Sequence, residues 1–248
     1  MRVLAVDTAT RVCSVAVVEN QGLLAELTVN HGHTHSTHLM PMIDQLLSQC
    51  RLSVHDLDGF AVTIGPGSFT GLRIGLSTIK GLAFATGKPA AGVSALEVLA
   101  HQFSCAGRPI CSMIDARKGE VYAAGYILRN GAPVEVWPAA AVTLEDAVAG
   151  MSTGISDGIA GECLFVGSGA RLYQDKIAGL LGRRAAFAPA GQDDIRAATV
   201  GKLGIGRLIQ GQFSPLYQLN PWYIRPSDAE QKMGGQSLLG RANQEQAG

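Results

Sequence analysis

The spacing of apolar positions in the first hundred residues predicts three strands, followed by alternating helices and strands. Short polar turns separate the first three strands, which favours an antiparallel meander over 3–6, 13–18 and 23–29. The period then changes to that of a helix. The apolar positions of this helix follow one stripe, made of Leu39, Met42, Ile43, Leu46, Leu47 and Cys50.

Helices and strands alternate after this helix. We expect strands at 60–64 and 90–93, and helices at 70–86 and 95–103. Gly87 follows the helix at 70–86 directly, which is a typical helix end.

The second half of the chain opens with the same pattern, and this predicts an internal duplication. The expected strands are 109–114, 120–128, 133–137 and 164–166, and the expected helices are 144–149, 170–181 and 195–210. Asp7 and Asp115 each follow a buried strand at a turn. We therefore expect one domain over 1–104, a second and smaller one over 105–226, and a flexible tail over 227–248.

Composition narrows the class of protein. The chain of 248 residues is 47% hydrophobic and 16% charged, which excludes a wholly disordered chain. Lys plus Arg equals Asp plus Glu at 20 each, so a protein that binds nucleic acid by itself is disfavoured. No apolar run approaches the roughly twenty residues of a membrane helix. Five scattered cysteines without a C-x-x-C pair are typical of buried thiols in the cytoplasm.

The segment from Gly65 to Gly75 is rich in glycine but fails as a nucleotide loop. A Walker loop needs Gly-Lys-Ser/Thr at its end, and here Leu72 follows Gly71. A dinucleotide fingerprint needs a third glycine where Thr70 stands, and an acidic residue about twenty positions later. We therefore expect no bound cofactor.

Three of these glycines, Gly67, Gly71 and Gly75, are four residues apart and fall on one helical stripe. Such a stripe lets a second backbone approach closely. Packing inside the same domain is one explanation, contact with another chain is a second, and contact with a ligand phosphate is a third. Our prediction is contact with another chain.

The two aspartates stand where phosphotransferases of the actin–Hsp70–sugar kinase type carry a D-x-G-T motif. In that motif the glycine lets the backbone approach phosphate, and the aspartate holds magnesium through water. Here Ala9 replaces the glycine, and the second copy reads Asp115-Ala116-Arg117-Lys118. Each copy is either a structural turn or a weakened phosphate site.

Two further patterns carry little chemistry. Imidazole is a ligand of zinc and iron, but no carboxylate or cysteine lies among the clustered histidines His31, His33, His35 and His38. We expect a solvated turn there and no metal site. A G-x-S-x-G match at 154–158 is interpreted as chance, because every histidine precedes Ser156 and a nucleophile elbow needs a later one.

Several segments together resemble the TsaB family, also called YeaZ. The strongest is the run G-P-G-S-F-T-G-L-R-I-G at 65–75. Val6–Thr10 and His35-Ser36 before Leu39-Met40-Pro41 also match. Ile114–Tyr122 and Pro221–Arg225 add support, so the resemblance spans roughly residues 2–225.

The resemblance implies a fold and a role. The expected fold class is α/β, with two tandem actin-like or RNase H-like (ASKHA) domains, each a mixed sheet with packed helices. The implied role is that of a non-catalytic subunit beside TsaD and the ATPase TsaE. TsaD transfers threonylcarbamoyl to adenosine 37 of tRNAs that read ANN codons. TsaD-like sequences carry metal-binding histidines where this chain has Ala95 and Leu99, and apolar side chains cannot bind a metal.

The implied partners are a TsaD-like subunit, a TsaE-like ATPase and, when the chain is alone, a second copy of itself. Transfer RNA is reached only through the complex. We expect the partner surface on the helices at 37–50 and 70–86, with the residues Leu39, Met42, Ile43, Leu46, Gly67, Phe69, Gly71, Arg73 and Gly75. The alternative is an enzyme in its own right, either a kinase-like ATPase or a glycoprotease-like peptidase.

Overall fold

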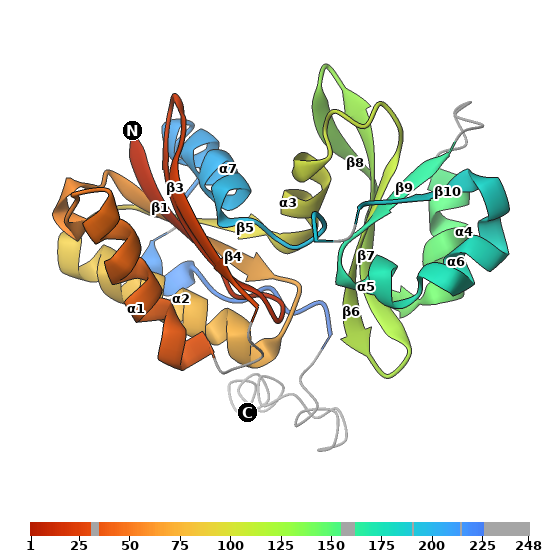
Figure 1. Ribbon diagram of the computed structural model, residues 1–248, viewed down its shortest axis with the longest axis horizontal. Helices are drawn as coiled ribbons and strands as arrows, with labels where there is room; N and C mark the ends of the chain where they lie inside the picture. The colour runs from red at the N-terminus through yellow and green to blue at the C-terminus, as the bar shows by residue number, and fades with distance from the viewer. Residues whose placement is uncertain (31–34, 155–161, 190, 214, 226–248) are drawn as a thin grey trace, which may run out of the picture.

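The structure is a computed structural model of the chain and describes residues 1–30, 35–154, 162–189, 191–213 and 215–225. These residues form two five-stranded sheets with helices packed on them (Figure 1). Within the described ranges, no helix is long and apolar enough to cross a membrane.

The first sheet combines an antiparallel meander with two parallel strands, in the order β3-β2-β1-β4-β5. Its strands are β1 (Arg2–Asp7), β2 (Cys13–Glu19), β3 (Gly22–Val29), β4 (Gly59–Gly65) and β5 (Ala90–Ser94). Short turns join the antiparallel strands, whereas α1 (His35–Gln49), η1 (Val54–Asp56) and α2 (Phe69–Thr86) lie in the long connections. Parallel pairing requires such long crossovers.

The second sheet repeats this arrangement, in the order β10-β9-β6-β7-β8. Its strands are β6 (Ile110–Arg117), β7 (Glu120–Arg129), β8 (Ala132–Thr143), β9 (Cys163–Val166) and β10 (Ala185–Phe187). Its outer helices are α4 (Leu144–Gly154), α5 (Ser168–Leu172), α6 (Gln174–Leu181) and η2 (Gly182–Arg184). The repeated strand order confirms the predicted duplication and fold class.

The last helix of each half packs on the sheet of the other half. Helix α3 (Ala95–Gln102) follows β5 but lies against β6, while α7 (Ala197–Ile209) follows β10 but lies across β1, β2 and β4. The N-terminus of α7 is held there by the first sheet, because Ser14 and Glu26 accept hydrogen bonds from the amides of Ala197 and Ala198. Figure 1 shows both helices between the two sheets.

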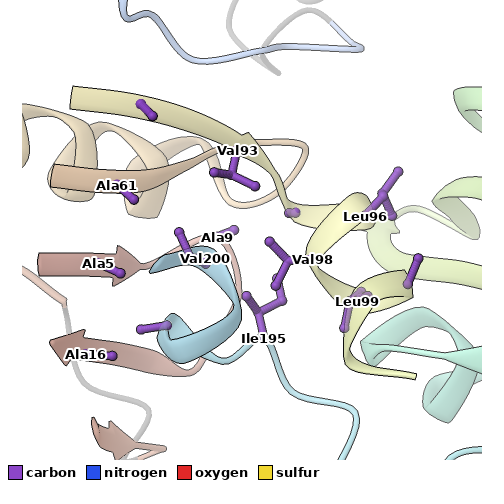
Figure 2. Packing of buried hydrophobic residues seen from close by; sticks show 14 of the residues in the cluster. Ala5, Ala9, Ala16, Ala61, Val93, Leu96, Val98, Leu99, Ile195 and Val200 are labelled. Atoms are coloured by element: carbon purple, nitrogen blue, oxygen red, sulfur yellow. The ribbon is translucent and has the colours of Figure 1, made fainter. Parts of the chain in front are cut away.

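One apolar cluster therefore spans both halves. It joins small residues of the first sheet to α3, α7 and the second sheet, and includes Ala5, Ala16, Ala61, Val93, Leu96, Val98, Leu99, Ile110, Ile114, Ile195 and Val200 (Figure 2). Gly204 faces Ala61 without a side chain between them, which brings α7 close to the sheet. Burial of this shared surface stabilises the two halves as one body.

Two expected elements differ from the observed ones. The strand expected at 133–137 continues to Thr143, through Pro138. Strand β8 is at the edge of its sheet. Proline has no backbone N–H to donate, and an edge strand tolerates this because it pairs on one side only. The helix expected at 170–181 is divided at Tyr173, which ends α5 with φ −108° and ψ 19°.

Candidate functional site

The last residue of β1, Asp7, has a completely buried carboxyl group at the start of the turn that follows. The Thr63 hydroxyl donates a hydrogen bond of 2.6 Å to Asp7 Oδ1, and the Ala9 amide donates one of 3.2 Å to the same oxygen. Among the described residues, Asp7 Oδ2 has no hydrogen-bond partner. Burial raises the pKa of Asp7 to about 7, although the bonds from Thr63 and Ala9 act in the opposite direction.

Gly71 and Gly75 of α2, together with Gly67 just before the helix, pack against this turn. A Cβ atom added to Gly71 would overlap the carbonyl oxygen of Thr8, and one added to Gly75 would overlap the Thr8 hydroxyl. One added to Gly67 would overlap the carbonyl oxygen of Ala9, which also accepts a 2.7 Å hydrogen bond from the Ser68 amide. The prediction that this stripe contacts another chain is therefore wrong: it packs inside its own half.

The close contact of α2 favours the structural explanation of the first aspartate turn. Thr8 donates its hydroxyl to the carbonyl oxygen of Gly71 at 2.8 Å, so the turn and the helix are bonded as well as packed. The backbone surface that would approach a phosphate is thus occupied by the protein's own helix.

The second aspartate lies near the end of β6 and bonds to the turn that follows. Asp115 Oδ1 accepts a 2.8 Å hydrogen bond from the Arg117 amide, and the Asp115 amide donates to Ser168 Oγ at 3.3 Å. Arg117 and Lys118 both have positive φ angles, of 62° and 55°. This tight β6–β7 turn is therefore shaped by backbone geometry and by its own carboxylate.

The apolar stripe of α1 is also turned inward. Leu39, Met42, Ile43 and Leu46 lie in the apolar cluster between α1, α2 and the first sheet, and none is more than 6% exposed. The prediction that these four side chains form the partner surface is therefore wrong. A helical stripe buries itself against whatever apolar surface is nearest, and here that surface is the sheet.

The outer faces of the same two helices carry other residues. Phe84 is 83% exposed near the end of α2, and Met40 is 48% exposed on α1. Arg73 is exposed and Phe69 is half-buried, so these two predicted site residues do lie on the outside of α2.

Tyr223 completes a small cluster with Phe69 and Arg73. The Tyr223 and Phe69 rings stack with their centroids 4.6 Å apart, and Arg73 Cζ lies 3.8 Å from the centroid of the Phe69 ring. Arg73 Nε also donates a 3.0 Å hydrogen bond to Tyr223 Oη. No sequence pattern points to Tyr223, since no periodicity links it to Arg73, which is 150 positions away.

The described residues contain no group of three or more His, Cys, Asp or Glu side chains that could hold a metal. His35 Nε2 donates a hydrogen bond of 2.8 Å to the Thr10 carbonyl oxygen. Residues 31–34 and 155–161, which include His31, His33 and Ser156, lie outside the described part of the chain. The absence of a metal site stays a prediction.

Comparisons with known proteins agree with the resemblance. Residues 22–182 match the family model described as TsaD, tRNA N6-adenosine threonylcarbamoyltransferase. The Bacillus subtilis tRNA threonylcarbamoyladenosine biosynthesis protein TsaB is 31% identical over 94% of this chain and 97% of its own length. The Escherichia coli TsaB is 40% identical over 51% of this chain and 55% of its own. The crystal structure of YeaZ from Pseudomonas aeruginosa aligns with a TM-score of 0.75 and 27% identity, covering 90% of this chain and 99% of that one.

Proposed function

Since the chain belongs to the TsaB family of tRNA threonylcarbamoyladenosine biosynthesis proteins, we propose that it is a non-catalytic subunit of the complex that makes this nucleoside. Its place in the complex is beside a TsaD-like catalytic subunit and a TsaE-like ATPase. The modified nucleoside is at position 37 of tRNAs that read ANN codons, and tRNA contacts the chain only through the complex. The complex works in the cytoplasm.

The burial of Asp7 under α2 is the observation that carries this proposal. A carboxylate that holds magnesium through water must be ionised and reached by solvent. Asp7 is closed off by the helix, and its pKa of about 7 keeps a large fraction of it protonated at neutral pH. Since Ala95 and Leu99 are buried apolar side chains at the expected metal-ligand positions, a catalytic role has no support there either.

The partner surface is the outer face of α1 and α2. It presents the exposed apolar side chains of Met40 on α1 and Phe84 on α2, and the exposed side chain of Arg73 on α2. Phe84 is 83% exposed, so a partner that covers its ring would gain the burial of a large apolar side chain. The TsaD-like subunit occupies this face in the complex, and a second copy of the chain occupies it when the protein is alone.

The test is depletion of the protein in its host, followed by mass spectrometry of nucleosides from total tRNA. We expect threonylcarbamoyladenosine to fall and to be restored by the unaltered chain but not by Phe84→Asp. The matched control is Leu180→Asp, because Leu180 is an exposed apolar residue on α6, in the other half. An unchanged nucleoside level after depletion would refute the role, and ATP or peptide hydrolysis by the isolated chain would refute its non-catalytic character.

A further inference from the structure

The chain after α7 returns across both halves of the molecule. We call residues 219–225 the strap. At its beginning Leu219 is buried in the apolar cluster of the first half. The Trp222 amide then donates a 2.7 Å hydrogen bond to the carbonyl oxygen of Ile64, and a Cβ atom added to Gly65 would lie 2.5 Å from the Trp222 carbonyl oxygen.

The middle of the strap follows α2. Lys80 Nζ donates to Asn220 Oδ1 at 3.3 Å, and the Tyr223 ring lies on Phe69. Together with the contacts at Ile64, these interactions attach residues 219–223 to β4 and α2 of the first half.

The end of the strap is bound to the second half. Arg225 Nη2 donates a 3.0 Å hydrogen bond to the carbonyl oxygen of Ala116, and Nη1 forms an ion pair with Glu120. The Arg225 side chain is only 19% exposed, and its Nε atom is buried without a hydrogen-bond partner among the described residues. Burying a guanidinium group is costly unless the charge is paired. The ion pair with Glu120 is therefore the main contact that keeps Arg225 in this position.

The strap crosses a particular place in the fold. It runs from the end of β4 at Gly65 to the turn after β6, which are the carboxyl ends of parallel strands in the two sheets. Open α/β sheets bind their ligands outside these strand ends. Figure 1 shows the strap passing from α2 to the foot of β6, on the side away from α3 and α7.

We propose that the strap is a latch between the two halves. The apolar cluster around α3 and α7 joins the halves and acts as the pivot. On the opposite side Arg225 fastens the strap, and with it the first half, to the β6–β7 turn of the second half. When the contacts of Arg225 with Glu120 and Ala116 break, the halves rotate about the pivot and this side opens.

The experiment measures the distance between the halves by pulsed electron spin resonance in the full chain. Spin labels are placed at Ser77→Cys on α2 and Ala178→Cys on α6, both exposed, after Cys50 and Cys105 are changed to serine. We expect one narrow distance distribution for the latched chain. Arg225→Glu should add a second, displaced population, and the charge exchange Arg225→Glu with Glu120→Arg should remove it again.

Arg184→Glu is the matched control, because Arg184 is an exposed arginine in η2 of the second half. It should leave the distribution unchanged. A distribution that stays the same in Arg225→Glu would overturn the proposal. If that variant fails to fold, Arg225→Ala takes its place, because it removes the ion pair with Glu120 and the hydrogen bond to Ala116 without adding a charge: a second population supports the latch, and an unchanged distribution overturns it.

Discussion

Thr8 and Gly71 are joined by two contacts. The Thr8 hydroxyl donates a hydrogen bond to the Gly71 carbonyl oxygen, and the Thr8 carbonyl oxygen occupies the space that a Gly71 side chain would need. This contact joins the aspartate turn to α2. It also changes what the glycine stripe is expected to do when it is mutated.

Gly71→Ala should destabilise the isolated chain by about 1–3 kcal/mol or more, since the new methyl group overlaps backbone atoms that cannot move aside. Gly81→Ala is the control in the same helix, because an added Cβ there meets no atom within 4 Å. It should stabilise the chain by about 0.5–1 kcal/mol through helix propensity. Urea unfolding of the two variants measures both effects, and equal stabilities would contradict the close packing of Gly71 on Thr8. Gly75→Arg should unfold the isolated chain for the same reason.

The raised pKa of Asp7 predicts a pH-dependent stability. The folded state keeps its proton up to about pH 7, whereas the unfolded state loses it near 3.8, so the folded state binds more protons between these values. The contribution of protonated Asp7 to the free energy of unfolding is therefore complete below about pH 4, and it is lost as the pH rises through 7. It should amount to a few kcal/mol, because each pKa unit is worth about 1.4 kcal/mol.

The measurement compares the unaltered chain with Asp7→Asn by urea unfolding from pH 4 to pH 8. Relative to the variant, the unaltered chain should lose free energy of unfolding over this interval. Parallel pH profiles would mean that Asp7 titrates normally in the folded protein.

Tyr223→Ala should lower the free energy of unfolding by about 1–3 kcal/mol, since it removes a stacked ring and the acceptor of the Arg73 hydrogen bond. The control is Tyr217→Ala, at a tyrosine that is 75% exposed in η3 (Leu216–Gln218). Its effect should stay below about 0.5 kcal/mol. Thermal unfolding of both variants measures the loss of stability. A larger loss in Tyr223→Ala than in Tyr217→Ala shows that the strap is packed on α2, and equal losses would show that it is not.

Phe84→Asp should weaken association with the TsaD-like subunit at least tenfold, which corresponds to about 1.4 kcal/mol. The Phe84 ring is exposed in the chain alone and would be buried in the complex. The variant would bury a charged carboxylate at that position, which is costly without a partner charge. Calorimetric titration measures the dissociation constant, with Leu180→Asp as the control. Equal binding by both variants would move the partner surface away from α2.

Protein purified without a histidine tag should contain less than about 0.2 metal ions per chain, because a true site would fill towards one. Elemental analysis checks this value. Stoichiometric zinc or iron would show that the histidines at 31–38 form a real site.

Sequence patterns predicted most elements and their order, because hydrophobic period and turn residues act locally, but they missed the three-residue strand β10. They could not predict which surface each apolar stripe covers. Leu39 and Leu46 have the same spacing whether they face the sheet or a partner, and Gly71 permits close approach by any backbone. Likewise, α3 has an apolar face that fits either sheet. The contact between Arg225 and Glu120 joins residues 105 positions apart and leaves no local pattern. The limits at 104 and 226 stay predictions.

The exchange of α3 and α7 has a consequence for how the molecule holds together. A fragment of residues 1–104 would carry the sheet that α7 covers but not α7 itself, and would keep α3 without the sheet it covers. The complementary fragment would have the reverse defect. Each lobe is thus completed by the chain of the other, so the two lobes should unfold in one cooperative transition and not as separate units.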